Sequence, residues 1–199
     1  MKTWISLGAI AVMGAVGLFF VRASRFGAEK VPYRVREKDG RFELRDYPAL
    51  PVACTAMYGG ANDDSFEKLF RFIAGGNARD EKIAMTTPVF IDGPIGVQTS
   101  MSFGMPAETQ RRGVPEPKAG AIEITERPRA RVAAVRFVGA SREAAERKAV
   151  EELRAWMKTR GIEAEGDPII AYYDAPFIPG PLRRNEAMLR VRGEASSDF

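Results

Sequence analysis

The side chains best suited to acid–base chemistry lie near the C-terminus. Glu186 and Asp174 are close in sequence to two adjacent tyrosines, Tyr172 and Tyr173. A carboxylate held in an apolar pocket can act as a general base, with a tyrosine hydroxyl as its partner. One candidate function is therefore a small enzyme with Glu186 or Asp174 as base. Pairing of Glu186 with the neighbouring arginines at 183 and 184 would instead indicate a structural role.

The chain has no histidine and one cysteine, Cys54. This composition excludes Ser-His-Asp and Cys-His catalysis, histidine metal ligands and an internal disulfide. No nucleophile and base stand at a diagnostic spacing, so we favour a protein that is not an enzyme. Cys54, Met57 and Met85 are interpreted as packing residues.

The positive charge is concentrated at the N-terminus. Of the net charge of +4, residues 1–30 carry +3, from four basic residues and one acidic residue. The remaining 26 basic and 25 acidic side chains nearly balance. A basic surface for phosphate backbones is therefore not expected, and nucleic acid is not predicted as a partner.

Residues 4–21 form a run of 18 residues without a formal charge. As a helix this run would be roughly 27 Å long, enough to span a bilayer. We expect a single-pass membrane anchor whose orientation the flanking charges barely decide. The alternative is a signal peptide cleaved near Val21-Arg22-Ala23, which would give a secreted or periplasmic protein. The expected organisation is anchor and linker (1–30), domain (31–192) and tail (193–199).

An internal repeat organises the domain. Residues 41–60 match residues 121–140 at an offset of 80, with Glu43 on Glu123 and Pro48 on Pro128. Each half reads as strand, strand, helix, strand, strand, so each needs the other to cover its apolar face. Ala84 on Ala171 and Met101 on Met188 raise the offset to 87. This predicts seven extra residues in the second helix, residues 141–160, compared with the first, residues 64–74.

Three segments carry a family resemblance: residues 42–48 (FELRDYP), 77–89 (NARDEKIAMTTPV) and 172–186 (YYDAPFIPGPLRRNE). Their order and spacing resemble the SOUL haem-binding protein family over about residues 31–192. The resemblance implies an α+β fold, a distorted antiparallel β-barrel of two pseudo-symmetric ββαββ halves flanked by two helices. With the anchor, this fold would follow an N-terminal transmembrane helix.

The resemblance also implies a haem or tetrapyrrole cleft between the first helix and the loop before the last strand. Apolar walls suit a flat macrocycle, and cations at the rim suit its propionates. The implied walls are Phe66, Leu69, Phe70, Phe72, Ile73, Phe177, Ile178, Pro179 and Pro181. The implied rim cations are Lys68, Arg71, Arg183 and Arg184. We expect Phe66, Leu69, Phe70 and Ile73 to share one helix face, with Phe72 beside it.

Some members of the family are proposed to ligate haem iron through histidine, which this chain lacks. The resemblance therefore implies a porphyrin held by apolar contacts with weak or no axial ligation. The leading hypothesis is a membrane-anchored, non-catalytic binder of haem or another flat apolar molecule. The alternatives are the carboxylate enzyme above and a protein-interaction module at the membrane surface that uses the Phe-Ile-Pro-Gly-Pro loop.

Overall fold

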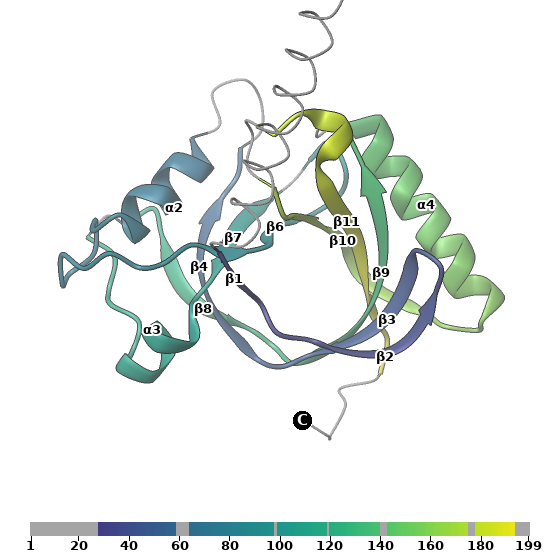
Figure 1. Cartoon of the computed structure of the whole chain (residues 1–199), viewed down its shortest axis with the longest axis horizontal. Helices are drawn as coiled ribbons and strands as arrows, with labels where there is room; N and C mark the ends of the chain where they lie inside the picture. The colour runs from purple at the N-terminus through teal and green to yellow at the C-terminus, as the bar shows by residue number, and fades with distance from the viewer. Residues whose placement is uncertain are drawn as a thin grey trace, which may run out of the picture.

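A computed structural model describes residues 28–58, 64–97, 99–118, 120–139, 143–174 and 178–193. Its main element is a nine-stranded antiparallel sheet that curls into a half-barrel (Figure 1). In spatial order the strands are β2 (Arg34–Asp39), β3 (Phe42–Tyr47), β9 (Ala130–Val138), β11 (Arg184–Val191), β10 (Ala164–Tyr172), β6 (Val89–Asp92), β7 (Ser100–Gly104), β4 (Leu50–Ala56) and β8 (Glu123–Arg127). A separate short parallel pair joins β1 (Glu29–Lys30) to β5 (Thr86–Thr87).

The two long helices lie on opposite outer sides of the half-barrel (Figure 1). These are α2 (Ser65–Ile73), against β4 and β7, and α4 (Glu143–Thr159), against β9, β10 and β11. Two shorter helices are α3 (Ala107–Arg112) and the 3-10 helix η1 (Gly180–Leu182). The α+β class and the flanking helices are confirmed. The expected barrel is an open half-barrel, with β2 and β8 as its edges.

Strand register confirms the duplication. Phe42 on β3 pairs with Val135 on β9, and Cys54 on β4 pairs with Glu123 on β8. Moving residue 42 forward by 80 and residue 135 back by 80 gives residues 122 and 55, which continue the β4–β8 register. Each half therefore pairs both of its first strands with the other half, because the fold has a pseudo-two-fold axis.

The second pair of strands shows that the predicted match of Met101 with Met188 is wrong. Thr55 and Val135 are equivalent at the 80-residue offset, and they pair with Met101 and Ala187 respectively. Met101 therefore corresponds to Ala187, an offset of 86 residues. A one-residue error matters because neighbouring residues of a strand face opposite sides of the sheet.

The seven extra residues also lie elsewhere than predicted. Ser102 pairs with Phe90 on β6, and its equivalent at the offset of 86, Met188, pairs with Ile169 on β10, so Phe90 corresponds to Ile169 at an offset of 79 residues. Ala171 thus corresponds to Asp92 and not to Ala84. The offset rises from 79 to 86 between β10 and β11, in the connection that contains the Pro-rich loop. Helix α4 has 17 residues and α2 has nine, but this difference adds nothing to the offset. The connection from α2 to β6 is longer than the one from α4 to β10 and makes up for it.

Three apolar clusters form the core. One packs α4 on the outer face of the sheet around Leu153 and Trp156, and another packs α2 around Leu69 and Phe72. The third, around Met188, contains the inward-facing residues of the half-barrel. Alternating residues of β11 serve different clusters, since Ala187 and Leu189 face α4 whereas Met188 faces inward. This alternation is what the two-residue period of a strand requires.

The predicted membrane span, residues 4–21, lies outside the described residues. Within the described part of the chain, no helix is long and apolar enough to cross a bilayer. Strand β1 is already part of the folded domain, because its Glu29 side chain accepts a hydrogen bond from the Ala107 amide at 3.0 Å. Val31 is already part of the inward-facing core.

Candidate functional site

Helix α2 has one buried face and one exposed aromatic pair. Leu69, Phe72 and Ile73 are at most 5% exposed, whereas Phe66 and Phe70 are 40% and 51% exposed. The predicted face is therefore wrong in one respect, since Phe72 belongs to the core and Phe66 and Phe70 do not. Residues 66, 69, 70 and 73 and residues 69, 72 and 73 both satisfy the helical period, so packing against the sheet decides which set is buried.

The exposed aromatic pair is ordered by its neighbours. The rings of Phe66 and Phe70 lie 6.2 Å apart at an interplanar angle of 12°. The Phe66 ring also meets the edge of Phe103 from the core, 5.5 Å between centroids. Two exposed, nearly parallel aromatic rings on one helix surface form an apolar platform, which suits an apolar ligand.

The cations of α2 are held only by surface pairs. Lys68 Nζ lies 2.5 Å from an Asp64 carboxylate oxygen, and Arg71 pairs with Glu67 at 3.2 Å. Exposed pairs one helical turn apart contribute little stability, so either cation can turn to another anion at low cost. Lys68 and Arg71 therefore remain candidates for the predicted rim cations.

Only some residues of the predicted loop wall are both described and exposed to a ligand. Phe177 lies outside the described residues. Ile178 is 2% exposed and so belongs to the protein interior, whereas Pro179 and Pro181 are exposed. Arg183 Nε donates a hydrogen bond to the Ile178 carbonyl at 2.6 Å, which holds the loop onto itself. Of the predicted loop residues, the exposed prolines remain as possible ligand contacts.

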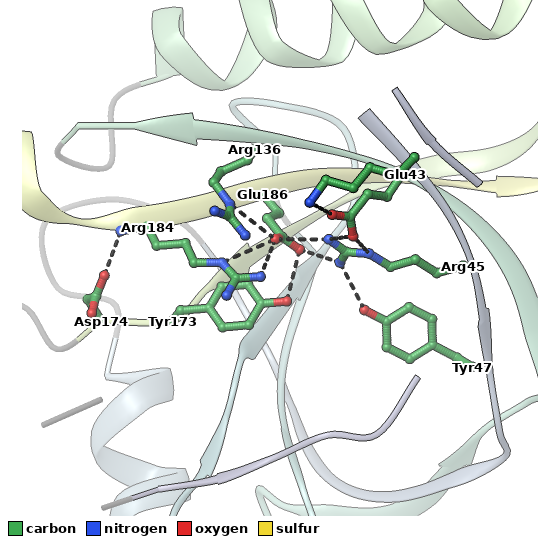
Figure 2. A network of polar contacts seen from close by, with 9 residues as sticks. Glu43, Arg45, Tyr47, Arg136, Tyr173, Asp174, Arg184 and Glu186 are labelled. Atoms are coloured by element: carbon green, nitrogen blue, oxygen red, sulfur yellow. Dashed lines mark hydrogen bonds and ion pairs between the residues drawn. The ribbon is translucent and has the colours of Figure 1, made fainter. Parts of the chain in front are cut away.

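Arg184 and Glu186 belong to a buried ionic network inside the half-barrel (Figure 2). Glu186 is fully buried, and Arg45 donates to both of its carboxylate oxygens at 2.5 and 3.1 Å. Arg184 donates to the same carboxylate at 2.6 Å, and the Tyr173 hydroxyl donates to it at 2.9 Å. Arg45 also donates to Glu43 at 2.8 Å. At the edge of the network, Lys38 lies 3.4 Å from Glu43 and Arg136 lies 3.9 Å from Glu186.

The network fixes the charge of Glu186. Burial alone would raise the pKa of this carboxyl group, but hydrogen bonds and charges from Arg45 and Arg184 lower it to about 2. Burial raises the pKa of the Tyr47 hydroxyl, which accepts from Arg45 at 3.4 Å, to about 12. A carboxylate this acidic is a poor proton acceptor near neutral pH. Glu186 therefore has the structural role that pairing with arginine indicates.

The remaining acid–base candidates also have structural partners. Asp174 accepts a hydrogen bond from the Arg184 amide at 2.5 Å, which ties the two ends of the β10–β11 connection. Tyr172 donates to Glu146 of α4 at 2.5 Å, whereas Tyr173 faces the interior of the half-barrel. The two adjacent tyrosines thus serve opposite sides of the sheet, as strand alternation predicts.

The described residues contain no group of three or more His, Cys, Asp or Glu side chains arranged to hold a metal ion. Cys54 is half-buried, and burial raises the pKa of its thiol, so the thiolate that would ligate iron is disfavoured. Met57 and Met85 pack against the core cluster of α2. The positions of Met57 and Met85 agree with their interpretation as packing residues, whereas Cys54 belongs to none of the three apolar clusters.

Sequence reasoning missed Arg45 as the centre of the network. Its side chain is 2% exposed and stacks on the Tyr33 ring at 4.3 Å. A signal was present, since Glu43, Arg45 and Tyr47 alternate on one face of a predicted strand. Three polar side chains on a buried face indicate a partner across the sheet.

Comparison with solved structures shows that the fold recurs in other proteins. A hydrolase from Listeria innocua superposes with a TM-score of 0.57 at 11% identity, over 85% of this chain and 96% of that one. The C-terminal domain of EcmrR superposes with a TM-score of 0.52 at 14% identity, over 80% and 97% of the two chains. At these identities the likeness concerns the fold alone. No curated protein sequence matches the chain.

A sequence model described as "SOUL heme-binding protein" matches residues 28–190. The match begins one residue before β1 and ends within β11, so it includes both halves of the repeat. It also spans α2 and the whole buried network. This chain belongs to the SOUL haem-binding protein family.

Proposed function

We propose that the chain binds haem or another tetrapyrrole on the exposed face of α2, without catalysing a reaction. The observation that carries the proposal is the stacked, exposed pair Phe66 and Phe70 in a member of a haem-binding family. An apolar platform of this kind is uncommon on a surface helix unless it meets a ligand or a partner.

The residues fit a macrocycle held by its faces and edges. Phe66 and Phe70 would stack on the ring, and Lys68 and Arg71 would exchange their surface carboxylates for the propionates. The exposed Pro179 and Pro181 of the β10–β11 connection are candidates for the opposite wall. The described residues offer no histidine or metal-binding cluster, so axial ligation is not required by the proposal.

A haemin titration tests this site. The full-length chain in non-ionic detergent is expected to bind one haemin saturably, followed by the Soret band. Phe66→Ser with Phe70→Ser should weaken binding by about tenfold or more, because both stacking faces are lost. Val35→Ser on the edge strand β2 removes a similarly exposed apolar side chain, 45% exposed, and should leave the affinity unchanged.

Two results would count against the site. One is a titration that does not saturate, and the other is an equal loss of affinity in the Val35 variant. Thermal unfolding of each variant, followed by circular dichroism, separates lost binding from lost structure.

We also propose that residues 4–21 anchor the protein in a membrane as a single pass, with the folded domain near the bilayer surface. The support is the length and apolar character of the run. Full-length protein is expected to remain in the membrane fraction after extraction with sodium carbonate at high pH. Replacing Ala11 and Gly14 with Asp should release it, since charges at the centre of a span are costly. A mature chain that starts after residue 23 would instead reveal a cleaved signal peptide.

The structure does not favour the carboxylate enzyme. Its proposed base, Glu186, is engaged on both carboxylate oxygens by Arg45 and by Arg184 or Tyr173. The likeness to a hydrolase concerns the fold and carries no activity to this chain. A loop interaction module is also weakened, because Ile178 from the Phe-Ile-Pro-Gly-Pro segment is buried.

A further inference from the structure

A cavity opens at the end of the half-barrel where β9 begins and β11 ends. Its volume is about 600 Å³, within the range of small-molecule sites. It lies between the β6–β7 turn, the β8–β9 turn and the start of β10, with Asp92, Pro128, Gly166 and Arg190 among its lining residues. The buried network lies at the other end, since Glu186 pairs with Arg136 near the end of β9.

A smaller apolar cavity of about 30 Å³ lies beside this one, toward the inside of the half-barrel. The two share Pro128, Ala130, Ile169 and Arg190 among their lining residues. Phe90 and Met188 line the inner cavity and belong to the inward-facing core. A ligand in the outer cavity would thus have an apolar surface behind it.

Arg190 is the guanidinium at this junction that has no partner in the described part of the chain. The other arginines nearby are engaged. Arg127 pairs with Asp92 at 2.7 and 3.1 Å and stacks over the Phe90 ring. Arg131 donates to Asp46 at 2.8 Å. Arg190 is half-buried and lines both cavities, yet no hydrogen bond, ion pair or ring contact joins its guanidinium to another described residue.

We propose that this cavity is a second binding site, for a small organic carboxylate with a flat apolar body. The carboxylate would form a bidentate pair with Arg190, and the apolar body would lie toward Ile169 and Met188. An unpaired, partly desolvated guanidinium with an apolar surface behind it is suited to such an anion. The site is distinct from the proposed haem surface, because none of its lining residues lies on α2.

Acidic side chains at the rim of the cavity would favour a cationic ligand over a carboxylate. Asp92 is neutralised by Arg127, but Glu165 and Asp167 also line the cavity and are exposed. Exposed carboxylates are screened by solvent and salt, whereas a half-buried guanidinium acts through a lower dielectric. The ligand's charge should therefore be set by Arg190. A cationic ligand is the outcome if the rim carboxylates dominate.

Three probes with one indole ring separate these cases: indole-3-acetate, its neutral amide and the cation tryptamine. Isothermal titration into the full-length chain in non-ionic detergent, corrected with empty micelles, measures each affinity. We expect one site for the acetate and at least about tenfold weaker binding of the amide and of tryptamine. Arg190→Gln should reduce acetate binding to the level of the amide. Arg190→Lys should retain part of the preference, because the charge remains without the fork.

Arg192→Gln is the matched control, since Arg192 is on the same segment but pairs with Glu163 at the surface. It should leave all three affinities unchanged, as should Phe66→Ser with Phe70→Ser, which removes the proposed haem platform. The proposal is overturned if the acetate does not bind, if it binds no better than the amide or tryptamine, or if Arg190→Gln leaves its affinity intact. None of these results bears on the haemin titration.

Discussion

Replacing Glu186 with glutamine is expected to lower the free energy of unfolding by about 3–5 kcal/mol, the range seen when one member of a buried ion pair is removed. The variant leaves Arg45 with one carboxylate, Glu43, in place of two, and removes the carboxylate that Arg184 contacts. The excess positive charge then lies in an interior that water hardly reaches. Urea denaturation followed by far-UV circular dichroism measures the loss, with the slope of the transition as a check on two-state unfolding.

Glu163→Gln is the matched control for charge removal. Glu163 also pairs with an arginine, Arg192, but both side chains are more than 60% exposed. The expected cost is below about 1 kcal/mol. A double variant, Arg45→Met with Glu186→Leu, should be more stable than the sum of its single changes predicts, because the guanidinium and the carboxylate that pair with each other are removed together. Equal costs for Glu186→Gln and Glu163→Gln would contradict a buried network.

The same carboxylate gives a pH dependence of stability. Its pKa is lowered in the folded protein, from 4.5 to about 2, so its contribution is present above pH 4.5 and is lost as the pH falls toward 2. A shift of this size corresponds to about 3 kcal/mol across that window. The wild type should therefore lose more stability than Glu186→Gln between pH 5 and 2. Parallel curves for the two proteins would show that Glu186 carries no such shift.

Phe72 and Phe70 are expected to give opposite phenotypes although they are two residues apart. Phe72→Ala removes a ring that is 1% exposed in the core beneath α2, which should cost about 3–5 kcal/mol of stability. Phe70→Ala removes a ring that is 51% exposed, and the expected cost is below about 1 kcal/mol. The losses of haemin affinity should be in the reverse order, small for Phe72→Ala and larger for Phe70→Ala. Phe70→Ala should weaken binding several-fold in a protein of nearly normal stability.

Urea denaturation and the haemin titration, made on both variants, decide this comparison. At a temperature where the Phe72 variant remains folded, its haemin affinity should be close to that of the wild type. A loss of affinity in Phe72→Ala alone would show that the ligand enters the interior below α2 and not the platform above it. Leu69→Ala, at a second buried position of the same helix, serves as a further control for stability.

The repeat made two similar halves predictable from sequence, and its offset of 80 around Glu43 and Glu123 agrees with the register of β3 with β9 and of β4 with β8. The barrel itself was implied by the family resemblance. The face of α2 that packs against the sheet was less predictable. In a nine-residue helix with four apolar side chains beyond the buried Leu69, several faces satisfy the helical period. Only the sheet beneath decides that Phe72 is buried and that Phe66 and Phe70 are not.

Partners distant in sequence explain the other differences. Nothing near Arg184 or Glu186 reveals Arg45, which lies 141 residues earlier than Glu186 and joins it across β3, β9 and β11. Local reasoning placed Arg184 at the rim of a ligand site for this reason. The cavity beside Arg190 was equally hidden, because it is formed by turns from both halves of the repeat.

The exchanged pairing of β3 with β9 and β4 with β8 constrains how the chain folds. Neither half can complete its part of the sheet alone, so β3 and β4 must wait for β9 and β8, which are made about 80 residues later. Pairings this far apart in sequence slow folding, because loop closure precedes any gain from contact. During synthesis the first half would emerge with an unpaired ribbon edge, open to a second copy of itself. A chain ending after β7 should therefore form a symmetric dimer in which each copy supplies the strands that the other lacks.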